Sequence, residues 1–387
     1  MTVLTVHNCY QTPGGEDWVY RSESALLEER GHRVIRFTDD NARIASLGRV
    51  RAAVMSLWNP GAARAVRRII LQERVQVAHF HNTFPLLSAS VIRAARQCGA
   101  AVVQTLHNFR SVCPNGLLFR AGAPCRRCLG RRFPWPGLLY ACYRSSRAAT
   151  ALAAASVLTR RLTGTWHDGV DAYIVLSEFA RSLLLAAGAP ERKLNVKPNF
   201  VHPDPGPGDG AGGYVLFLGR LSEEKGIRIL VEAWKMLKPA ARLMIVGDGP
   251  LAGWVERQAD GAGIHWCGPL SHDAALAALR GAALLAAPSL CYEGSPLAVL
   301  ESFATGTPVA ASAIGSLAEL VRPGLTGWLA PPGNAEAWAV LLDQALSQTK
   351  LLRGMREHAR QQYLERYSAG VNYQMLLGIY RRAVERV

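Results

Sequence analysis

The stretch Tyr292-Glu293-Gly294-Ser295-Pro296-Leu297-Ala298-Val299-Leu300-Glu301-Ser302-Phe303-Ala304-Thr305-Gly306-Thr307-Pro308-Val309 places two glutamates eight positions apart around a Gly-Ser-Pro corner and an apolar run. Proline is favoured in the first turn of a helix, so Glu293 is expected on a loop and Glu301 inside the following helix. The backbone N–H groups between Ser295 and Ala298 would lie at the positive end of that helix, where anions and hydroxyl groups bind. The flanking carboxylates can accept hydrogen bonds from sugar hydroxyls, so the stretch predicts a carbohydrate or nucleotide site. The alternative without a binding role is that both glutamates lie on the solvated face of an amphipathic helix.

The length of the chain, 387 residues, exceeds one ordinary hydrophobic core and predicts two domains of roughly 200 residues each. In both halves, short apolar runs alternate with segments of helical periodicity, which indicates an α/β fold with two doubly wound parallel sheets. The expected strands are residues 3–6, 33–37, 75–80, 100–106, 170–176 and 194–196 in the first half and 214–218, 243–246, 264–268 and 283–287 in the second.

The domain boundary is expected where a Pro- and Gly-rich stretch interrupts the pattern. We therefore expect a first Rossmann-like domain over residues 1–201, a linker over 202–212 and a second Rossmann-like domain over 213–369. A final amphipathic helix over 370–387 is expected to return to the first domain. Residues 110–147, rich in cysteine and arginine, show little periodicity and are read as an insert in the first domain.

The positive charge is confined to the first half of the chain. Residues 1–200 hold 27 lysines and arginines against 12 acidic residues, whereas residues 201–387 hold 17 of each. No acidic residue occurs between Glu73 and Asp168. Such a surface attracts anionic lipid headgroups, pyrophosphate-linked substrates or nucleic acid, although a solubilising role is an alternative.

Four of the eight cysteines, Cys113, Cys125, Cys128 and Cys142, fall within the basic insert. In a chain expected in the cytoplasm, such a cluster favours a structural zinc site over disulfides, with buried free thiols as the alternative. No run of about 18 apolar residues is present, so no transmembrane helix is expected, and no signal peptide is expected at the N-terminus. The insert could contact a membrane through Trp135, Leu138, Leu139 and Tyr140.

Candidate ligand-binding residues follow the predicted strands. Gly15 lies in the turn after the first strand, where its backbone allows a phosphate or an acceptor to approach closely. His107 follows the strand 100–106, and its ring can donate to a sugar hydroxyl or a phosphate. His79 and His81 have no acidic residue near them in the sequence, so a catalytic metal is not expected there.

Arg220 and Lys225 flank the turn after the first strand of the second half, where both can reach a diphosphate. Gly247-x-Gly249 lacks the third glycine of a dinucleotide-binding motif and is followed directly by proline, which disfavours dinucleotide oxidation.

Gly14-Gly15, His107, Arg220, Lys225 and the two glutamates, in this order across two Rossmann-like halves, resemble the retaining nucleotide-sugar glycosyltransferases of family 4, which have the GT-B fold. The resemblance implies two domains that face each other across a cleft. It implies an enzyme of the hexosyltransferase type that moves a sugar from a UDP- or GDP-sugar to a hydroxyl of a glycan or lipid-linked acceptor, with no nucleic acid as partner. The insert resembles that of bacterial members that act in surface polysaccharide synthesis.

Residue by residue, the resemblance implies that Arg220 and Lys225 hold the diphosphate and that His107 contacts the donor sugar. Glu293 and the segment Gly294, Ser295, Pro296 and Leu297 would bind the hydroxyls of that sugar, and Glu301 those of the ribose. Gly268 and Leu270 would flank the base, and Gly15 would approach the diphosphate or the acceptor.

The chemistry implied by the resemblance needs no metal and no protein nucleophile. The charge that develops on the leaving diphosphate would be neutralised by Arg220, Lys225 and the helix N-terminus, and the sequence contains no Asp-x-Asp. Three alternatives remain: a sugar-nucleotide epimerase, a phosphorylase and a nonenzymatic polyanion-binding protein. The protein is expected in the cytoplasm, with peripheral contact to anionic lipid at the inner face of the membrane.

Overall fold

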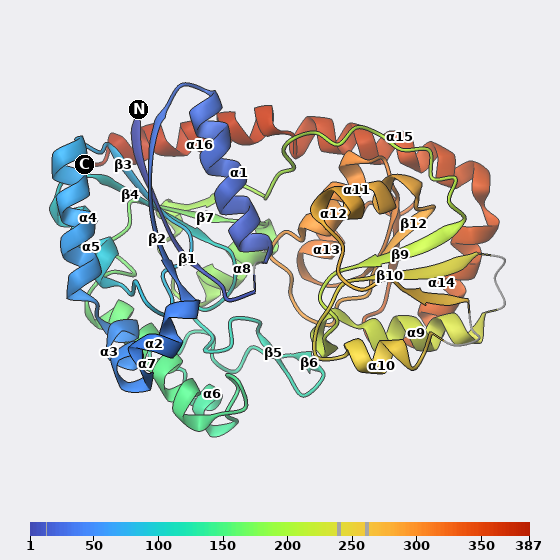
Figure 1. The fold of residues 1–387 in the computed structure, drawn as a ribbon, viewed down its shortest axis with the longest axis horizontal. Helices are drawn as coiled ribbons and strands as arrows, with labels where there is room; N and C mark the ends of the chain where they lie inside the picture. Colours follow the sequence, from blue (N-terminus) through green and yellow to red (C-terminus); the bar gives the residue numbers. More distant parts are fainter. Residues whose placement is uncertain (13, 238–240, 260–262) are drawn as a thin grey trace. The chain divides into compact units, whose positions relative to one another are not determined.

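The computed structural model describes residues 1–12, 14–237, 241–259 and 263–387, which form two compact units (Figure 1). Unit 1 comprises Met1–Leu118, Cys125–Pro198 and Asn372–Val387, and unit 2 comprises Phe119–Pro124 and Asn199–Val371. Each unit contains a six-stranded, entirely parallel sheet, which confirms the predicted α/β class.

The sheet of unit 1 has the order β2-β1-β3-β4-β7-β8. Its strands are β1 (Thr2–Cys9), β2 (Arg33–Asp40), β3 (Val77–Phe80), β4 (Ala101–Leu106), β7 (Ala172–Val175) and β8 (Leu194–Val196). The helices of the unit are α1 (Gly15–Glu29), α2 (Ile44–Leu47), α3 (Arg49–Leu57), α4 (Pro60–Glu73), α5 (Ser90–Gln97), α6 (Trp135–Leu139), α7 (Arg147–Leu162) and α8 (Glu178–Ala186). The strand order changes direction beside β1 and β3, and open parallel sheets bind ligands at the carboxyl ends of strands at such a point.

The sheet of unit 2 has the order β11-β10-β9-β12-β13-β14, the order of a Rossmann fold. Its strands are β9 (Tyr214–Leu218), β10 (Arg242–Val246), β11 (Ile264–Trp266), β12 (Leu284–Ala287), β13 (Val309–Ser312) and β14 (Gly327–Ala330). The helices are α9 (Ile227–Met236), α10 (Ala252–Glu256), α11 (His272–Gly281), α12 (Leu297–Ala304), α13 (Gly315–Leu320), α14 (Ala335–Ser347) and α15 (Thr349–Arg366). β14 was not predicted, because its short Gly-Trp-Leu-Ala run is too brief to show a period.

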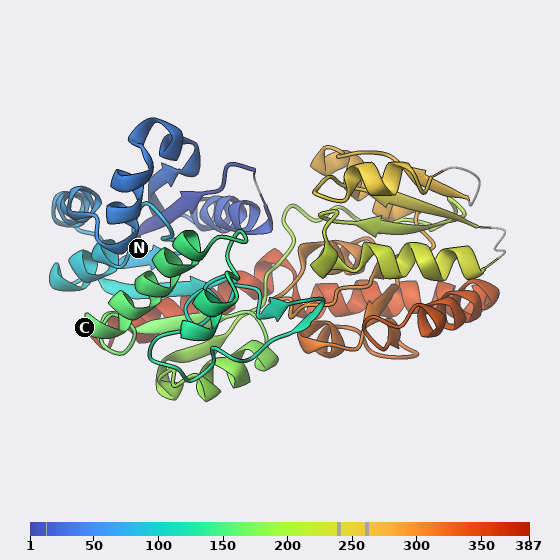
Figure 2. The same ribbon diagram turned by 90° about the horizontal axis from the view of Figure 1, so that it is seen from below.

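Burial on both faces explains why these strands read as continuous apolar runs. In β9, Val215 and Phe217 pack with α9 and α14, whereas the intervening Leu216 packs with α11, α12, α13 and α15. Successive side chains of a strand point to opposite faces, so each face of this sheet has its own apolar core and its own layer of helices (Figures 1 and 2).

The C-terminal helix α16 (Ala369–Val384) belongs to the core of unit 1. Its residues Leu376, Ile379 and Tyr380 are buried together with Val3 of β1 and Leu27 of α1. The expected return of the final helix to the first domain is therefore confirmed.

The glycine-rich stretch 202–212 lies along unit 2. Gly208, Gly210 and Gly212 donate backbone hydrogen bonds to Thr305, Arg280 and Gly281, respectively. A Cβ atom at Gly208 would lie 2.3 Å from the carbonyl oxygen of Arg280, so glycine is needed there for close approach to the end of α11. The glycines that suggest a linker in the sequence therefore also allow this stretch to pack closely against unit 2.

The insert contains local structure. β5 (Phe119–Arg120) and β6 (Ala123–Pro124) form an antiparallel hairpin, and α6 follows further along the chain. Both α6 and α3 pack on α7 (Figure 1). Among the described residues, no helix combines the length and the apolar character that crossing a bilayer requires.

Candidate active site

The loop between β9 and α9 carries both predicted diphosphate-binding cations. Arg220 lies two residues after the end of β9; its side chain is exposed and forms no ion pair with any residue in the described ranges. Lys225 ends a 3-10 turn, and Gly226 caps α9 with a φ of 71°. A Cβ atom at Gly226 would lie 1.9 Å from the carbonyl oxygen of Pro288, so only glycine lets this loop meet the loop after β12.

Lys225 and Glu293 form an ion pair, with 2.6 Å between Nζ and Oε1. Ser289 donates a second hydrogen bond of 2.7 Å to the same carboxylate oxygen. Burial by itself would raise the pKa of Glu293, but the charge of Lys225 and these hydrogen bonds hold it below its ordinary value. Burial would lower the pKa of Lys225, but the Glu293 charge raises it. Both groups therefore stay ionised at neutral pH.

The backbone after Glu293 presents free amides, as the sequence predicts. The N–H groups of Gly294, Ser295, Leu297 and Ala298 form no hydrogen bond with any described part of the chain. They lie at the N-terminus of α12, which begins at Leu297 after Pro296. Unpaired N–H groups and the helix dipole together make this corner a seat for an anion or for sugar hydroxyls.

Two contacts hold this corner in place. Asn199 donates from Nδ2 to the carbonyl oxygen of Ser295 over 2.8 Å, and Ser316 of α13 donates from its hydroxyl to the carbonyl oxygen of Glu293 over 2.9 Å. Neither Asn199 nor Ser316 was singled out from the sequence, because their role depends on which loops the sheet order brings together.

Glu301 lies inside α12, as predicted, and is buried. Nδ1 of His272 lies 3.7 Å from its Oε1, and burial lowers the pKa of His272, so this ring does not offset the burial of Glu301 with a charge at neutral pH. Burial raises the pKa of Glu301 to about 7. A carboxyl group held near its titration point can bind hydroxyls as an acceptor once it loses its proton.

Gly268 and Leu270, predicted to flank the base, lie on the loop after β11. The carbonyl oxygen of Gly268 accepts a hydrogen bond from the N–H of Gly247, which joins this loop to the one after β10. Leu270 is 39% exposed and is therefore accessible to a ligand. Both residues follow the carboxyl end of the sheet in unit 2, as do Lys225 and Glu293.

In unit 1, His107 follows the carboxyl end of β4 and lines a pocket. The pocket is bounded by polar side chains that include Glu16, Asn108, Arg110 and Arg160. Gly15 is the first residue of α1, directly before Glu16. The structure therefore gives His107 a pocket of its own within unit 1.

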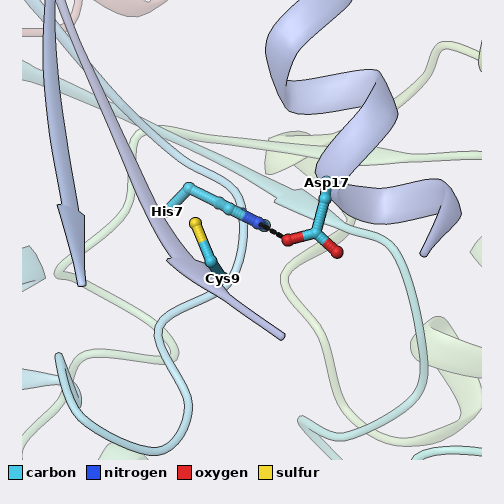
Figure 3. Close-up of side chains that lie close together, drawn as sticks. All are labelled: His7, Cys9 and Asp17. Atoms are coloured by element: carbon cyan, nitrogen blue, oxygen red, sulfur yellow. Dashed lines mark hydrogen bonds and ion pairs between the residues drawn. The ribbon is translucent and has the colours of Figure 1, made fainter. Parts of the chain in front are cut away.

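The surroundings of His79 and His81 differ from what the sequence suggested. Glu23 of α1 lies 3.2 Å from His79 and 3.5 Å from His81 through its Oε1, so a carboxylate does accompany the two histidines. Sequence distance concealed it, because α1 and β3 meet only in the folded sheet. A second group joins His7, Cys9 and Asp17, in which His7 Nε2 lies 2.9 Å from Asp17 Oδ1 (Figure 3).

Among the described residues, only these two groups contain three or more His, Cys, Asp or Glu side chains whose ligand atoms all lie within 4.8 Å of one another. The four cysteines of the insert do not form such a group. Their sulfur atoms are therefore too far apart to bind one zinc ion together. They are nonetheless neighbours: burial, and then the charges of Cys113, Cys125 and Cys142, raise the pKa of Cys128 to about 12.

Two parallel α/β units, one with the Rossmann order, and a C-terminal helix that belongs to the first unit define the GT-B class of fold. The chain belongs to glycosyltransferase family 4: residues 13–205 match the profile "Glycosyltransferase Family 4", and residues 212–348 match "Glycosyl transferases group 1".

Two relatives illustrate the similarity. The phosphatidyl-myo-inositol mannosyltransferase of Mycobacterium leprae is 30% identical over 229 residues, 56% of this chain and 60% of that protein. The amylovoran biosynthesis glycosyltransferase AmsK of Erwinia amylovora is 28% identical over 184 residues, 43% of this chain and 45% of that protein. The match thus spans about half the length of these relatives.

Solved structures show the same fold. Sucrose-phosphate synthase from Thermosynechococcus elongatus superposes with a TM-score of 0.73 at 16% identity and covers 100% of both chains. HepE from Anabaena, solved in complex with UDP, superposes with a TM-score of 0.67 at 18% identity and covers 98% of this chain and 99% of its own.

Proposed function

We propose that this chain transfers a sugar, with retention of configuration, from a nucleoside diphosphate sugar to a hydroxyl of a glycan or lipid-linked acceptor. The observation that carries the proposal is the Lys225–Glu293 pair beside the unpaired amides that precede α12. A cation, a carboxylate and an anion-binding helix terminus at one loop match the diphosphate and the hydroxyls of such a donor.

In this proposal Lys225 and Arg220 neutralise the leaving diphosphate, and Arg220 is free to do so because it has no ion-pair partner in the described chain. Glu293 and the amides from Gly294 to Leu297 orient the transferred sugar. Glu301 accepts from the ribose, and the loop with Gly268 and Leu270 flanks the base. The bound UDP of the HepE structure favours a uridine donor, and a GDP-sugar is the alternative to be tested beside it.

The acceptor side is proposed for unit 1, with Gly15 and the pocket around His107. The amylovoran relative supports a role in bacterial surface polysaccharide synthesis. The mannosyltransferase relative, whose name identifies a phospholipid acceptor, supports a lipid-linked one.

Contact with anionic lipid is proposed for the insert surface, defined here as Arg127, Arg131, Trp135, Leu139 and Tyr140. Trp135, Leu139 and Tyr140 are 48%, 55% and 40% exposed. The guanidinium of Arg131 lies 5.0 Å from the Trp135 ring centroid, and that of Arg127 lies 5.5 Å from the Tyr140 ring centroid. Aromatic rings beside arginines suit the headgroup region of a membrane, where the ring contacts the apolar part of the lipid and the arginine contacts anionic headgroups.

A structural zinc at Cys113, Cys125, Cys128 and Cys142 remains a proposal from the sequence. It rests on the sequence pattern and on the proximity of Cys128 to the other three thiols: burial, and then their charges, raise the pKa of Cys128. Binding would require the sulfur atoms to move closer together.

The proposal is tested by incubating the protein with UDP- and GDP-sugars and by following donor consumption with and without a lipid-linked glycan acceptor. We expect consumption that depends on the acceptor, and thermal stabilisation by the matching nucleotide. Consumption without acceptor would indicate an epimerase, and consumption that needs free phosphate would indicate a phosphorylase. Absence of any nucleotide binding would overturn the proposal.

A further inference from the structure

A chain of buried polar side chains leads from Lys197 to His107 inside unit 1. Nζ of Lys197, the residue after β8, lies 2.8 Å from Oε2 of Glu23, and both side chains are 2% exposed. Burial alone would raise the pKa of Glu23, but Lys197 and then the neighbouring histidines hold it well below its ordinary value. Glu23 is therefore a carboxylate that can only accept hydrogen bonds.

The ionised Glu23 determines which nitrogen of His81 carries hydrogen. Nε2 of His81 lies 3.5 Å from Oε1 of Glu23, which also lies 3.2 Å from Nδ1 of His79. Neither Nε2 of His81 nor Oε1 of Glu23 forms a hydrogen bond with any other described residue. A lone pair turned toward a carboxylate would be repelled, whereas an N–H is attracted. Burial, assisted by His79, also lowers the pKa of His81 well below its ordinary value, so the ring is neutral. His81 thus carries its hydrogen on Nε2 and a lone pair on Nδ1.

This lone pair faces His107. Nδ1 of His81 lies 3.0 Å from Nε2 of His107. The two rings are nearly coplanar, 18° apart with centroids 5.2 Å from each other, as an edge-to-edge N–H···N hydrogen bond requires. Since Nδ1 of His81 accepts, Nε2 of His107 must be the donor. Burial lowers the pKa of His107 to about 3, so its remaining nitrogen, Nδ1, holds a lone pair.

Nδ1 of His107 is available to a ligand. It forms no hydrogen bond with a described residue, and it is not among the fully buried side-chain atoms that lack a partner. His107 lines the pocket described above, together with Asn82, Gln104 and Asn108.

A metal ion at Glu23, His79 and His81 fits the same atoms less well. Both nitrogens of His79 already have partners, the Tyr380 hydroxyl and the Thr105 hydroxyl, each at 2.8 Å. The ammonium group of Lys197 already supplies the positive charge at Glu23.

We propose that Lys197, Glu23 and His81 are positioning residues that fix His107 as the Nε2–H tautomer, so that its Nδ1 accepts a hydrogen bond from a sugar hydroxyl. The role of the ring toward a sugar rests on the proposed function, but the tautomer does not. This assignment reverses the direction expected from the sequence, in which His107 donates. A hydroxyl can serve as donor, so a sugar remains a suitable ligand.

The test is the 15N chemical shifts of both ring nitrogens in histidine-labelled full-length protein at pH 7. His107 is identified by the signals lost in His107→Gln. We expect a neutral His107 ring with hydrogen on Nε2. A ring with hydrogen on Nδ1, or on both nitrogens, would overturn the proposal whether or not the protein transfers sugar.

A double variant, Glu23→Gln with Lys197→Met, removes both charges while nearly keeping the volumes, so that no lone charge is left buried. We expect a mixture of His107 tautomers and a roughly tenfold higher KM for the sugar substrate, the loss of about one hydrogen bond. Asp171→Asn is the matched control, because it breaks the half-buried Arg96–Asp171 pair of the same unit. An unchanged His107 tautomer in the double variant, or the same KM change in the control, would count against positioning. If the double variant does not fold, the wild-type shifts alone decide.

Discussion

Nζ of Lys225 and Oε1 of Glu293 lie 2.6 Å apart, although 68 positions separate the two residues in the chain. The loops after β9 and β12 bring them together, because these two strands are neighbours in the sheet of unit 2. This relationship places a cation and a carboxylate next to the free amides before α12, and the first prediction follows from it.

Glu293→Gln and Lys225→Met should each reduce kcat/KM for sugar transfer by about 10²- to 10³-fold, because each removes a charged side chain from the proposed donor site. Steady-state kinetics and circular dichroism check the prediction together. Glu223→Gln is the control, since it removes an ion pair with Arg228 that lies nearby but is solvent-exposed. Full activity in either site variant would remove these residues from the proposed site.

Nucleotide affinity should increase as pH rises from about 5.5 to 8, because the pKa of Glu301 is raised to about 7 and its carboxylate form is the better acceptor for ribose hydroxyls. Isothermal titration across this range measures the effect. In Glu301→Gln the affinity should be lower and less dependent on pH, while Glu256→Gln on the exposed side of α10 should behave as wild type. An identical pH profile in Glu301→Gln would refute the assignment.

The stability of the ligand-free protein should fall as pH rises, whereas nucleotide affinity should increase. A carboxyl group whose folded pKa lies above its unfolded value binds more protons in the folded state, so stability falls as pH rises from about 4.5 to about 7. The contribution of Glu301 is on the order of 3 kcal/mol over this window. Thermal unfolding of wild type and Glu301→Gln, measured at several pH values, isolates this contribution. If the stability of the two proteins changed with pH in the same way, the prediction would be contradicted.

Gly226→Ala should destabilise unit 2 by about 2–4 kcal/mol, since alanine is strained at a φ of 71° and its Cβ would lie 1.9 Å from the carbonyl oxygen of Pro288. Gly253→Ala in α10 is the matched control; its nearest contact would be 3.7 Å, and alanine should leave stability unchanged or raise it. Urea unfolding monitored by tryptophan fluorescence compares the two. Equal stability of both variants would show that the two loops do not meet as described.

Replacing Arg127 and Arg131 by alanine should weaken binding to vesicles that contain phosphatidylserine, by about 1 kcal/mol for each arginine near the surface. Binding of the wild type should fall as salt rises from 0.05 to 0.5 M, at roughly the concentrations where surface charges become screened. Vesicle sedimentation measures both effects, with Arg257→Ala on the exposed part of unit 2 as the control. Salt-insensitive binding would remove the proposed membrane contact.

Purified protein should carry one zinc ion per chain if the four cysteines of the insert close around a metal. Elemental analysis of the wild type and of Cys128→Ser checks this, with Cys98→Ser as a control for a cysteine outside the insert. Absence of zinc, together with four titratable thiols in the insert, would establish free thiols instead.

Much of the fold could be predicted from local pattern. The predicted strand 214–218 coincides with β9, and the predicted 194–196 coincides with β8, because buried parallel strands are short apolar runs between turn residues. The corner at Gly294 to Leu297 was also predictable, since proline and glycine report the backbone conformation of their own positions.

The contacts of the candidate site were less accessible. Glu23 was not expected beside His79 and His81, because α1 and β3 are far apart in the sequence and meet only through the order of strands in unit 1. Asn199 and Ser316 were overlooked for the same reason. The spacing of cysteines in the sequence likewise does not fix the distances between their sulfur atoms. The four cysteines of the insert lie farther apart than a shared zinc ion requires.

The sequence by itself determined the alternation of strands and helices, the glycine and proline turns and the set of side chains at the carboxyl ends of strands, because these features depend on neighbours a few residues away. Only the tertiary structure decided that Lys225 pairs with Glu293, that Glu301 is buried enough to titrate near neutrality, and that Glu23 reaches His107 through His81. These properties depend on which strands lie side by side and on how much water the packing excludes, and neither is encoded at any single position.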